Sequence, residues 1–319
     1  MTSTADIIRD IGEGSIRAIA RALSRVENGS PDSADILDVL FGKQQGFTLG
    51  ITGPPGAGKS TLVNRMITRY RTTDNSVGVI AVDPSSPFTG GALLGDRIRM
   101  QSHASDPKVF IRSMGSRGHL GGLSGATRDA SCVLSAAGYS PVIIETVGVG
   151  QAEVEIADLA HITLLVLVPG LGDDVQSMKA GIMEIGDIIV LNKADRNGID
   201  QLESYVKASL EFMPADLKKP EVIRISAVSG EGLEDLWGAI DRLVAAQTGE
   251  EKTARSAVKT LNGILTENGI IISEKLLEIE YNGRKAAEEL ILAGQLSPYA
   301  IGKKLLERAE GMFKHNGSK

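Results

Sequence analysis

The amino-acid sequence predicts an α/β fold, in which a doubly wound, mostly parallel sheet carries N- and C-terminal helical extensions. Short apolar runs alternate with helical stretches through the middle of the chain, and several of these runs are rich in Val and Ile and apolar throughout. Strands that are buried on both faces have such continuous apolar runs, and strand–helix alternation is typical of parallel sheets. The segments on either side of this region have apolar residues at helical spacing instead.

The expected strands are the apolar runs Phe47–Thr52, Val77–Val82, Val109–Arg112, Val142–Glu145, Ile162–Val168, Ile188–Leu191 and Val222–Ser226. Apolar residues between Ile16 and Val26 predict one N-terminal helix, and those between Ile36 and Phe41 predict a second. After a polar run that begins at Gln247, helical patterns return as far as Leu306. We therefore expect a helical extension over residues 1–45, an α/β domain over 46–248 and a helical arm over 249–319.

Composition argues against several classes of protein. The 319-residue chain has a net charge of -6, whereas nucleic-acid-binding proteins usually have a basic surface. Its one cysteine, Cys132, cannot form an internal disulfide, and its four histidines lack ligand-like spacing. The longest apolar run, Ile162–Pro169, is far shorter than the roughly 20 residues of a membrane helix, and the chain does not begin like a signal peptide. We expect a soluble cytoplasmic protein that binds neither nucleic acid nor membrane.

The strongest motif is a glycine-rich loop between the first expected strand and a helix. It fits the pattern G-x-x-x-x-G-K-[ST] with Gly53, Pro54, Pro55, Gly56, Ala57, Gly58, Lys59 and Ser60, and Thr61 follows in the helix. Backbone N–H groups of such a loop cradle phosphates, and its glycines allow a close approach. We expect Lys59 to act as a catalytic residue on the β- and γ-phosphates and Ser60 to hold Mg²⁺.

Two later segments indicate that the bound base is guanine. The first resembles the N-K-x-D motif of GTPases, with Asn192, Lys193 and Asp195, and the second resembles a further base-contacting segment, with Ser226, Ala227 and Val228. The Asp195 carboxylate can accept hydrogen bonds from guanine N1–H and from its exocyclic amine, a pair that adenine lacks. The Lys193 stem can lie along the base. The sequence thus predicts a fold of the P-loop GTPase type that binds GTP and GDP.

Acidic residues near the expected strand ends are candidates for Mg²⁺ binding and catalysis. Glu145 and Gly148 form E-x-x-G where most GTPases have D-x-x-G. We expect Glu145 to reach Mg²⁺ through water and Gly148 to donate its N–H to the γ-phosphate. Asp83, at the carboxyl end of a strand, acts through a Mg²⁺-bound water or on the attacking water, and Asp96 is another metal candidate. Each acid also has a purely structural interpretation, at a strand end, a turn or a helix surface.

The segment after Gly148 predicts slow hydrolysis. Many small GTPases place a water-orienting Gln directly after this glycine, but Val149 stands there and Gln151 lies further on. A partner would then have to complete the site. The glycine-dense loop around Arg117 either contacts phosphate or a partner, or is a plain connection.

Together these motifs resemble the MeaB/ArgK family of GTPases. The matching stretches lie between about Gly50 and Ala227 and read TGPPGAGKST, AVDPSSPFTGGALLGDRIRM, RSMGSRGHLGGLS, VIIETVGVGQ, VPGLGDDVQSMKAGIMEIGDI and NKAD. The resemblance implies a GTPase chaperone that gates cofactor loading of the adenosylcobalamin-dependent methylmalonyl-CoA mutase, or a close relative, and protects or reactivates it. It also implies a homodimer formed through the C-terminal arm. A third switch over Pro169–Lys179 is expected to relay partner binding through Asp173, Gln176 and Lys179.

Two other functions stay open at this stage. A nickel-insertion GTPase for hydrogenase or urease shares the fold class but is expected to carry a His-rich tract or Cys/His ligands. A small-molecule kinase linked to amino-acid transport needs a substrate pocket with a positioned base. No such pocket is identified by the sequence, and a guanine-reading motif is unusual for a kinase of this kind.

Overall fold

The computed structural model describes residues 3–41, 43, 46–83, 103, 105–115, 125–146, 152–170, 183–214, 217–246, 269, 272–292, 301, 304–305 and 307–309. The chain divides into two compact units, Met1–Ala257 and Val258–Lys319.

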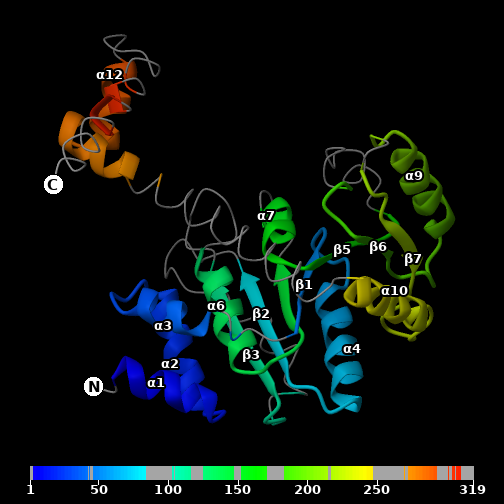
Figure 1. Ribbon diagram of the computed structural model, residues 1–319. Coiled ribbons are helices and arrows are strands. Elements are labelled where there is room, and N and C mark those ends of the chain that lie inside the picture. The colour runs from blue at the N-terminus through cyan, green and yellow to red at the C-terminus, as the bar shows by residue number, and fades with distance from the viewer. Residues whose placement is uncertain are drawn as a thin grey trace. The chain divides into compact units, whose positions relative to one another are not determined.

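A parallel sheet of seven strands forms the centre of the first unit (Figure 1). The strands lie in the order β3-β2-β4-β1-β5-β6-β7, and every neighbouring pair is parallel. Their bounds are β1 Thr48–Thr52, β2 Val77–Asp83, β3 Val109–Gly115, β4 Val142–Thr146, β5 Ile162–Leu167, β6 Ile188–Leu191 and β7 Glu221–Arg224. The predicted α/β fold is confirmed, and each predicted strand is present with ends that differ by a few residues at most.

Helices cover both faces of this sheet, as expected of a doubly wound fold (Figure 1). On one face pack α4 (Lys59–Thr72) and α10 (Leu233–Ala246). On the other face pack α6 (Gly125–Ala136), α7 (Ala152–Leu159) and α9 (Ile199–Glu211). Successive strand residues alternate between the two sides: Ile143 belongs to the first core, whereas Val142 and Ile144 belong to the second. Both faces are therefore dry, which explains the unbroken apolar runs in the sequence.

The N-terminal helices form an outer layer on α6. They are α1 (Thr4–Gly12), α2 (Ile16–Glu27) and α3 (Ser33–Leu40). The side chains of Ser3 and Ser15 cap the first two by accepting backbone N–H bonds, so both helix starts are encoded locally. Apolar residues of all three helices share one buried cluster with those of α6. The layer is thus continuous with the core on that side of the sheet.

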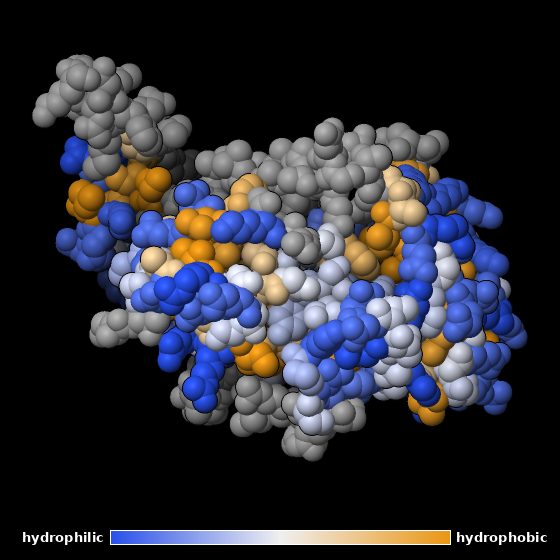
Figure 2. Space-filling view, turned by 60° about the horizontal axis from the view of Figure 1, so that its bottom comes forward, coloured by the Kyte–Doolittle hydropathy of each residue, from blue (hydrophilic) through white to orange (hydrophobic). Residues whose placement is uncertain are grey.

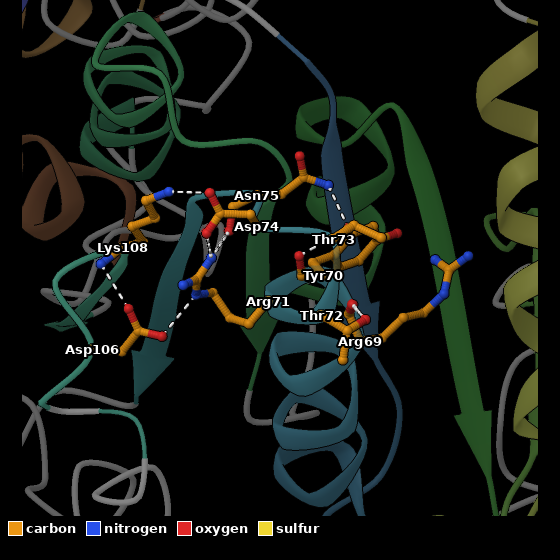
Figure 3. Close-up of polar contacts among 9 residues, drawn as sticks. All are labelled: Arg69, Tyr70, Arg71, Thr72, Thr73, Asp74, Asn75, Asp106 and Lys108. Carbon is orange, nitrogen blue, oxygen red and sulfur yellow. Dashed lines mark hydrogen bonds and ion pairs between the residues drawn. The ribbon is translucent and has the colours of Figure 1, made fainter.

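Charged side chains fix the amino-terminal edge of the sheet at the end of α4 (Figure 3). Arg71 Nε donates to Asp106 Oδ2 at 2.7 Å, and Arg71 Nη1 lies 3.4 Å from Asp74 Oδ1. Lys108 pairs with Asp74, and its backbone N–H donates to Asp106 Oδ1 at 2.9 Å. Lys108, followed by Arg71, holds the pKa of Asp74 below its ordinary value. The network ties α4 to the starts of β2 and β3, at the edge opposite the carboxyl ends of the strands.

The described residues of the second unit are helical except for the bend at Asn282 and Gly283. Residues 272–281 are helical, and α12 spans Arg284–Leu292. Gly283, with φ of +100°, lies between these two helices. Leu276 and Ala287 are buried, and Glu280 pairs with both Lys304 and Arg308. The helical extension predicted at the C-terminal end is therefore present.

The surface shows no single dominant apolar area on the face drawn in Figure 2, where apolar patches are separated by hydrophilic side chains. Among the large hydrophobic residues that the structure describes, Phe212 and Val228 are the most exposed, at 88% and 77%. Within the part of the chain that the structure describes, no helix combines the length and the apolar character needed to cross a membrane.

Candidate functional site

The glycine-rich loop runs from the carboxyl end of β1 to the first turn of α4. Lys59 and Ser60 are the first residues of that helix, and their side chains are only 6% and 8% exposed. Lys59 Nζ reaches back across the loop and donates to the carbonyl oxygens of Gly53 at 2.7 Å and Pro54 at 3.0 Å. The loop thus bends around its own ammonium group, beside the positive end of the helix dipole.

Two glycines of this loop are required by its geometry. Gly53 has φ of +136°, and a Cβ atom there would lie 2.1 Å from the carbonyl oxygen of Val166 in β5. Gly58 has φ of +90°, and a Cβ atom there would lie 2.4 Å from Nδ2 of Asn192. Side chains at these positions would force the loop away from β5 and from Asn192.

Ser60 and Glu145 meet beside the loop. Ser60 Oγ donates to Glu145 Oε1 at 2.6 Å, although the two residues are 85 positions apart in the sequence. β4 lies next to β1, with Ile51 in register with Glu145, so the sheet itself places this carboxylate. The adjoining strand ends are joined by Thr146 Oγ1, which lies 3.0 Å from Thr52 Oγ1. A hydroxyl and a carboxylate are oxygen donors of the kind that Mg²⁺ prefers, so this pair fits the metal.

Asn192 connects the loop to the segments that follow β6 and β7. Its Nδ2 donates to the Ala57 carbonyl at 2.7 Å, while its Oδ1 accepts the N–H groups of Ala227 at 3.0 Å and Lys193 at 2.8 Å. Lys193, with φ of +61°, donates from Nζ to the Gly56 carbonyl at 2.7 Å. Asn192 is only 2% exposed, so water competes little for these bonds.

Asp195 lies at the surface beside the buried Ser226. The Ser226 hydroxyl, hydrogen-bonded to the carboxylate, holds the pKa of Asp195 below its ordinary value, so Asp195 is ionised at neutral pH. An ionised carboxylate only accepts hydrogen bonds, which suits a partner with two N–H donors. The backbone of Ser226 closes a turn, since its N–H donates to Glu231 at 2.9 Å and its carbonyl accepts from Gly230 at 2.8 Å.

The parallel sheet brings these predicted residues to one edge, because the carboxyl ends of its strands meet there. Asp83 ends β2 at the same edge, in register with Gly115 of β3. Several other predicted residues lie outside the described part of the structure: the side chain of Asp83, all of Asp96, Gly148 and Arg117, and the relay residues Asp173, Gln176 and Lys179.

Sequence reasoning missed Arg65 on α4. Its Nε donates to the carbonyl oxygen of Ala227 at 2.8 Å and its Nη2 to that of Val228 at 2.5 Å. No local pattern marks this contact, because 162 residues separate Arg65 from Ala227. Helical periodicity alone places an arginine at this position on the solvent side.

The chain is similar to known proteins over most of its length. A family model described as methylmalonyl-CoA mutase-associated GTPase MeaB matches residues 19–275. A Pyrococcus horikoshii protein that is named as a GTPase is 42% identical over 314 residues, which are 96% of this chain and 98% of that protein. The mouse methylmalonic aciduria type A homolog, mitochondrial, is 35% identical over 245 residues, 70% of this chain and 59% of that protein. The crystal structure of an LAO/AO transport system kinase matches with a TM-score of 0.72 and 26% identity, covering 96% of this chain and 97% of that one.

Proposed function

Because the chain belongs to the family of methylmalonyl-CoA mutase-associated GTPases, MeaB, we propose that it is a chaperone for an adenosylcobalamin-dependent methylmalonyl-CoA mutase or a close relative. Its GTPase activity and its binding of guanine nucleotides follow from the family itself. In the proposed role, GTP hydrolysis gates cofactor loading of the mutase and protects or reactivates it. The family description supports this role, as does the mouse relative named after methylmalonic aciduria.

The main support for the nucleotide site is the position of Asn192. Its side chain bonds the phosphate loop at Ala57 and also bonds Ala227 in residues 226–228, here called the base segment. We assign the phosphates to residues 53–61 and the guanine to Lys193, Asp195 and residues 226–228. Lys59 bonds two carbonyl oxygens of this loop. These bonds place its ammonium at the loop to which we assign the phosphates.

Mg²⁺ is part of the proposal. Ser60 would hold the metal directly and Glu145 through water, and Asp83 and Asp96 stay candidates at the same edge. When bound, the cation would supply positive charge that offsets the negative charge of the phosphate oxygens. The chain's own contribution is to orient the oxygens of Ser60 and Glu145. The start of α4 holds the Ser60 hydroxyl in place, and β4 places Glu145 Oε1 2.6 Å from it.

The partner role rests on segments that the sequence singles out. Val149 stands where many small GTPases carry Gln, so we propose that the mutase completes or reorders the hydrolytic site. Residues 169–179 are proposed to relay mutase binding to that site, and the arm over 249–319 is proposed to form a homodimer.

The test is the rate of phosphate release from GTP with and without the purified mutase. We expect the mutase to accelerate hydrolysis. Alanine at Asp173, Gln176 or Lys179 should leave the basal rate and GDP affinity unchanged and reduce the acceleration. A mutase that changes neither the hydrolysis rate nor the nucleotide affinity would reject the chaperone role, and three fully stimulated variants would reject the relay. Recovery of the γ-phosphate on an amino acid, instead of as free phosphate, would favour the transport-linked kinase.

A further inference from the structure

Arg65 connects the helix of the phosphate loop to the segment that follows β7. It lies in the second turn of α4, six positions after Lys59, and its guanidinium donates to two successive carbonyl oxygens. The distances are 2.8 Å from Nε to Ala227 and 2.5 Å from Nη2 to Val228. Hydrogen bonds from a charged donor are stronger than neutral ones, and a planar fork fixes the orientation of the peptide groups that it bonds.

The segment is held from two sides. Ala227 donates its N–H to Asn192 at 3.0 Å, while its carbonyl accepts from Arg65. Asn192 in turn bonds the phosphate loop at Ala57, and Arg65 belongs to the helix that continues this loop. A closed circuit of contacts therefore runs from the loop through Asn192 to Ala227 and back through Arg65. Without Arg65 the carbonyl oxygens of Ala227 and Val228 would lose this contact with α4, and Val228 is 77% exposed.

The orientation of Asp195 depends on the same segment. Ser226 precedes Ala227 directly, and its hydroxyl lies beside the Asp195 carboxyl, whose pKa it lowers. The backbone of Ser226 also begins the turn that Gly230 and Glu231 close. If Ala227 and Val228 shifted, Ser226 would move with them, and the hydroxyl beside Asp195 would be displaced.

We propose that Arg65 is a positioning residue for guanine recognition, which it supports through Ala227 and Val228 without touching the nucleotide. This inference rests on the proposed nucleotide site. Arg65 would support binding of the base and not binding of the phosphates. Its removal should therefore lower the preference for guanine over adenine, and should not lower affinity for all nucleotides equally.

Arg69 is a matched control on the same helix. Like Arg65, it joins α4 to another part of the chain, in this case to α10, because it pairs with Asp241. Its guanidinium lies 5.1 Å from the ring centre of Tyr70 and 5.2 Å from that of Trp237. None of these residues belongs to the base segment. Loss of Arg69 should affect stability without changing the choice of base.

The experiment measures dissociation constants for GDP and ADP by competition with a fluorescent GDP analogue at fixed Mg²⁺. It compares the wild type with Arg65→Met, Arg65→Lys and Arg69→Met, and methionine keeps most of the apolar stem. Arg65→Met should weaken GDP by up to about 10-fold, because residues 226–228 lose two hydrogen bonds that hold them in place for guanine, and should leave ADP unchanged. Arg65→Lys should restore part of the loss because an ammonium can serve one carbonyl, and Arg69→Met should keep the wild-type ratio.

A wild-type GDP-to-ADP ratio in Arg65→Met would overturn the inference, whether both affinities stay or fall together. Far-ultraviolet circular dichroism reports whether each variant is folded, because Arg69 lies against the Trp237 ring and its loss would change the fluorescence of that tryptophan without unfolding. If the methionine variant unfolds, Arg65→Lys decides by the same ratio. A wild type that binds GDP and ADP equally would instead reject the proposed nucleotide site, and the inference with it.

Discussion

Replacement of Gly53 by alanine should destabilise the protein more than the same change at Gly56. Both glycines belong to the phosphate loop and both have positive φ, +136° and +75°. A Cβ atom on Gly53 would lie 2.1 Å from the carbonyl oxygen of Val166 and 3.0 Å from its carbonyl carbon, which are backbone atoms of β5. A Cβ atom on Gly56 would meet nothing within 4 Å. Gly56→Ala thus isolates the backbone effect, and Gly53→Ala adds a collision.

The expected magnitudes follow from these two terms. A non-glycine residue in left-handed backbone costs roughly 1–2 kcal/mol. Forcing extra atoms into a packed site adds typically about 1–3 kcal/mol, and here a strand backbone must move because no flexible side chain can yield. We expect the free energy of unfolding to fall by about 1 kcal/mol for Gly56→Ala and by about 3 kcal/mol for Gly53→Ala. For a domain of this size the difference corresponds to a Tm gap of about 4–8 °C.

Urea unfolding followed by tryptophan fluorescence measures both variants without nucleotide. Trp237 is the single tryptophan and is 6% exposed in the folded unit, so its emission should shift on unfolding. Equal unfolding free energies for the two variants would refute the collision with Val166. If Gly56→Ala lowered the free energy of unfolding more than Gly53→Ala does, the described geometry of the loop would be refuted.

Other predictions concern the site and the arm. Lys59→Ala should abolish phosphate release and weaken GTP binding while the fold survives; release at the wild-type rate would reject its role. Asp195→Asn should weaken GTP and favour xanthine nucleotides in competition assays, and an unchanged GTP preference would contradict this. Because the pKa of Asp195 is lowered from 3.8, its carboxylate stays charged above that value. Protonation of Asp195 should therefore not lower the GDP affinity between pH 8 and 5. A wild-type affinity that falls with pH in this range, while that of Asp195→Asn does not, would contradict this. A chain that ends at Thr248 should be monomeric by light scattering, and a persisting dimer would exclude the arm as the contact.

The sheet was predictable because both of its faces are covered. β5, Ile162–Leu167, is buried at every position, so its sequence is almost wholly apolar. The end of β7 was less readable: the apolar run continues through Ile225, but the ladder stops at Arg224 as Ser226 enters its turn. α1 was expected only as part of the helical extension over residues 1–45, and no pattern marked it as a separate helix. Its buried residues are only Ile7 and Ile11, and their burial depends on docking against other helices.

The sequence motifs identified the phosphate loop and the separate segments around Glu145, Asn192 and Ser226, but not the contacts that their side chains make with one another. The phosphate loop is a local sequence pattern, although two of its glycines, Gly53 and Gly58, are required by the close approach of Val166 and Asn192, which lie far away in the sequence. The contacts that assemble the site are long-range: Ser60 to Glu145 spans 85 residues and Arg65 to Ala227 spans 162. The motifs assigned Ser60 and Glu145 to one Mg²⁺ site, but no pattern in a single sequence marks Arg65, which looks like an ordinary surface residue of a helix.

The strand order has a consequence for synthesis. β1 lies between β4 and β5, and the bond from Asn192 to Ala57 spans 135 residues, so the nascent phosphate loop cannot be completed when it leaves the ribosome. At translation rates of about 5–20 residues per second, the loop waits roughly 7–30 s for its partners. The N-terminal helices wait as well, because their apolar faces pack against α6. During that interval Ile19 and Leu23 would be exposed on the emerging chain, so we expect the cell's general folding machinery to bind the nascent protein there.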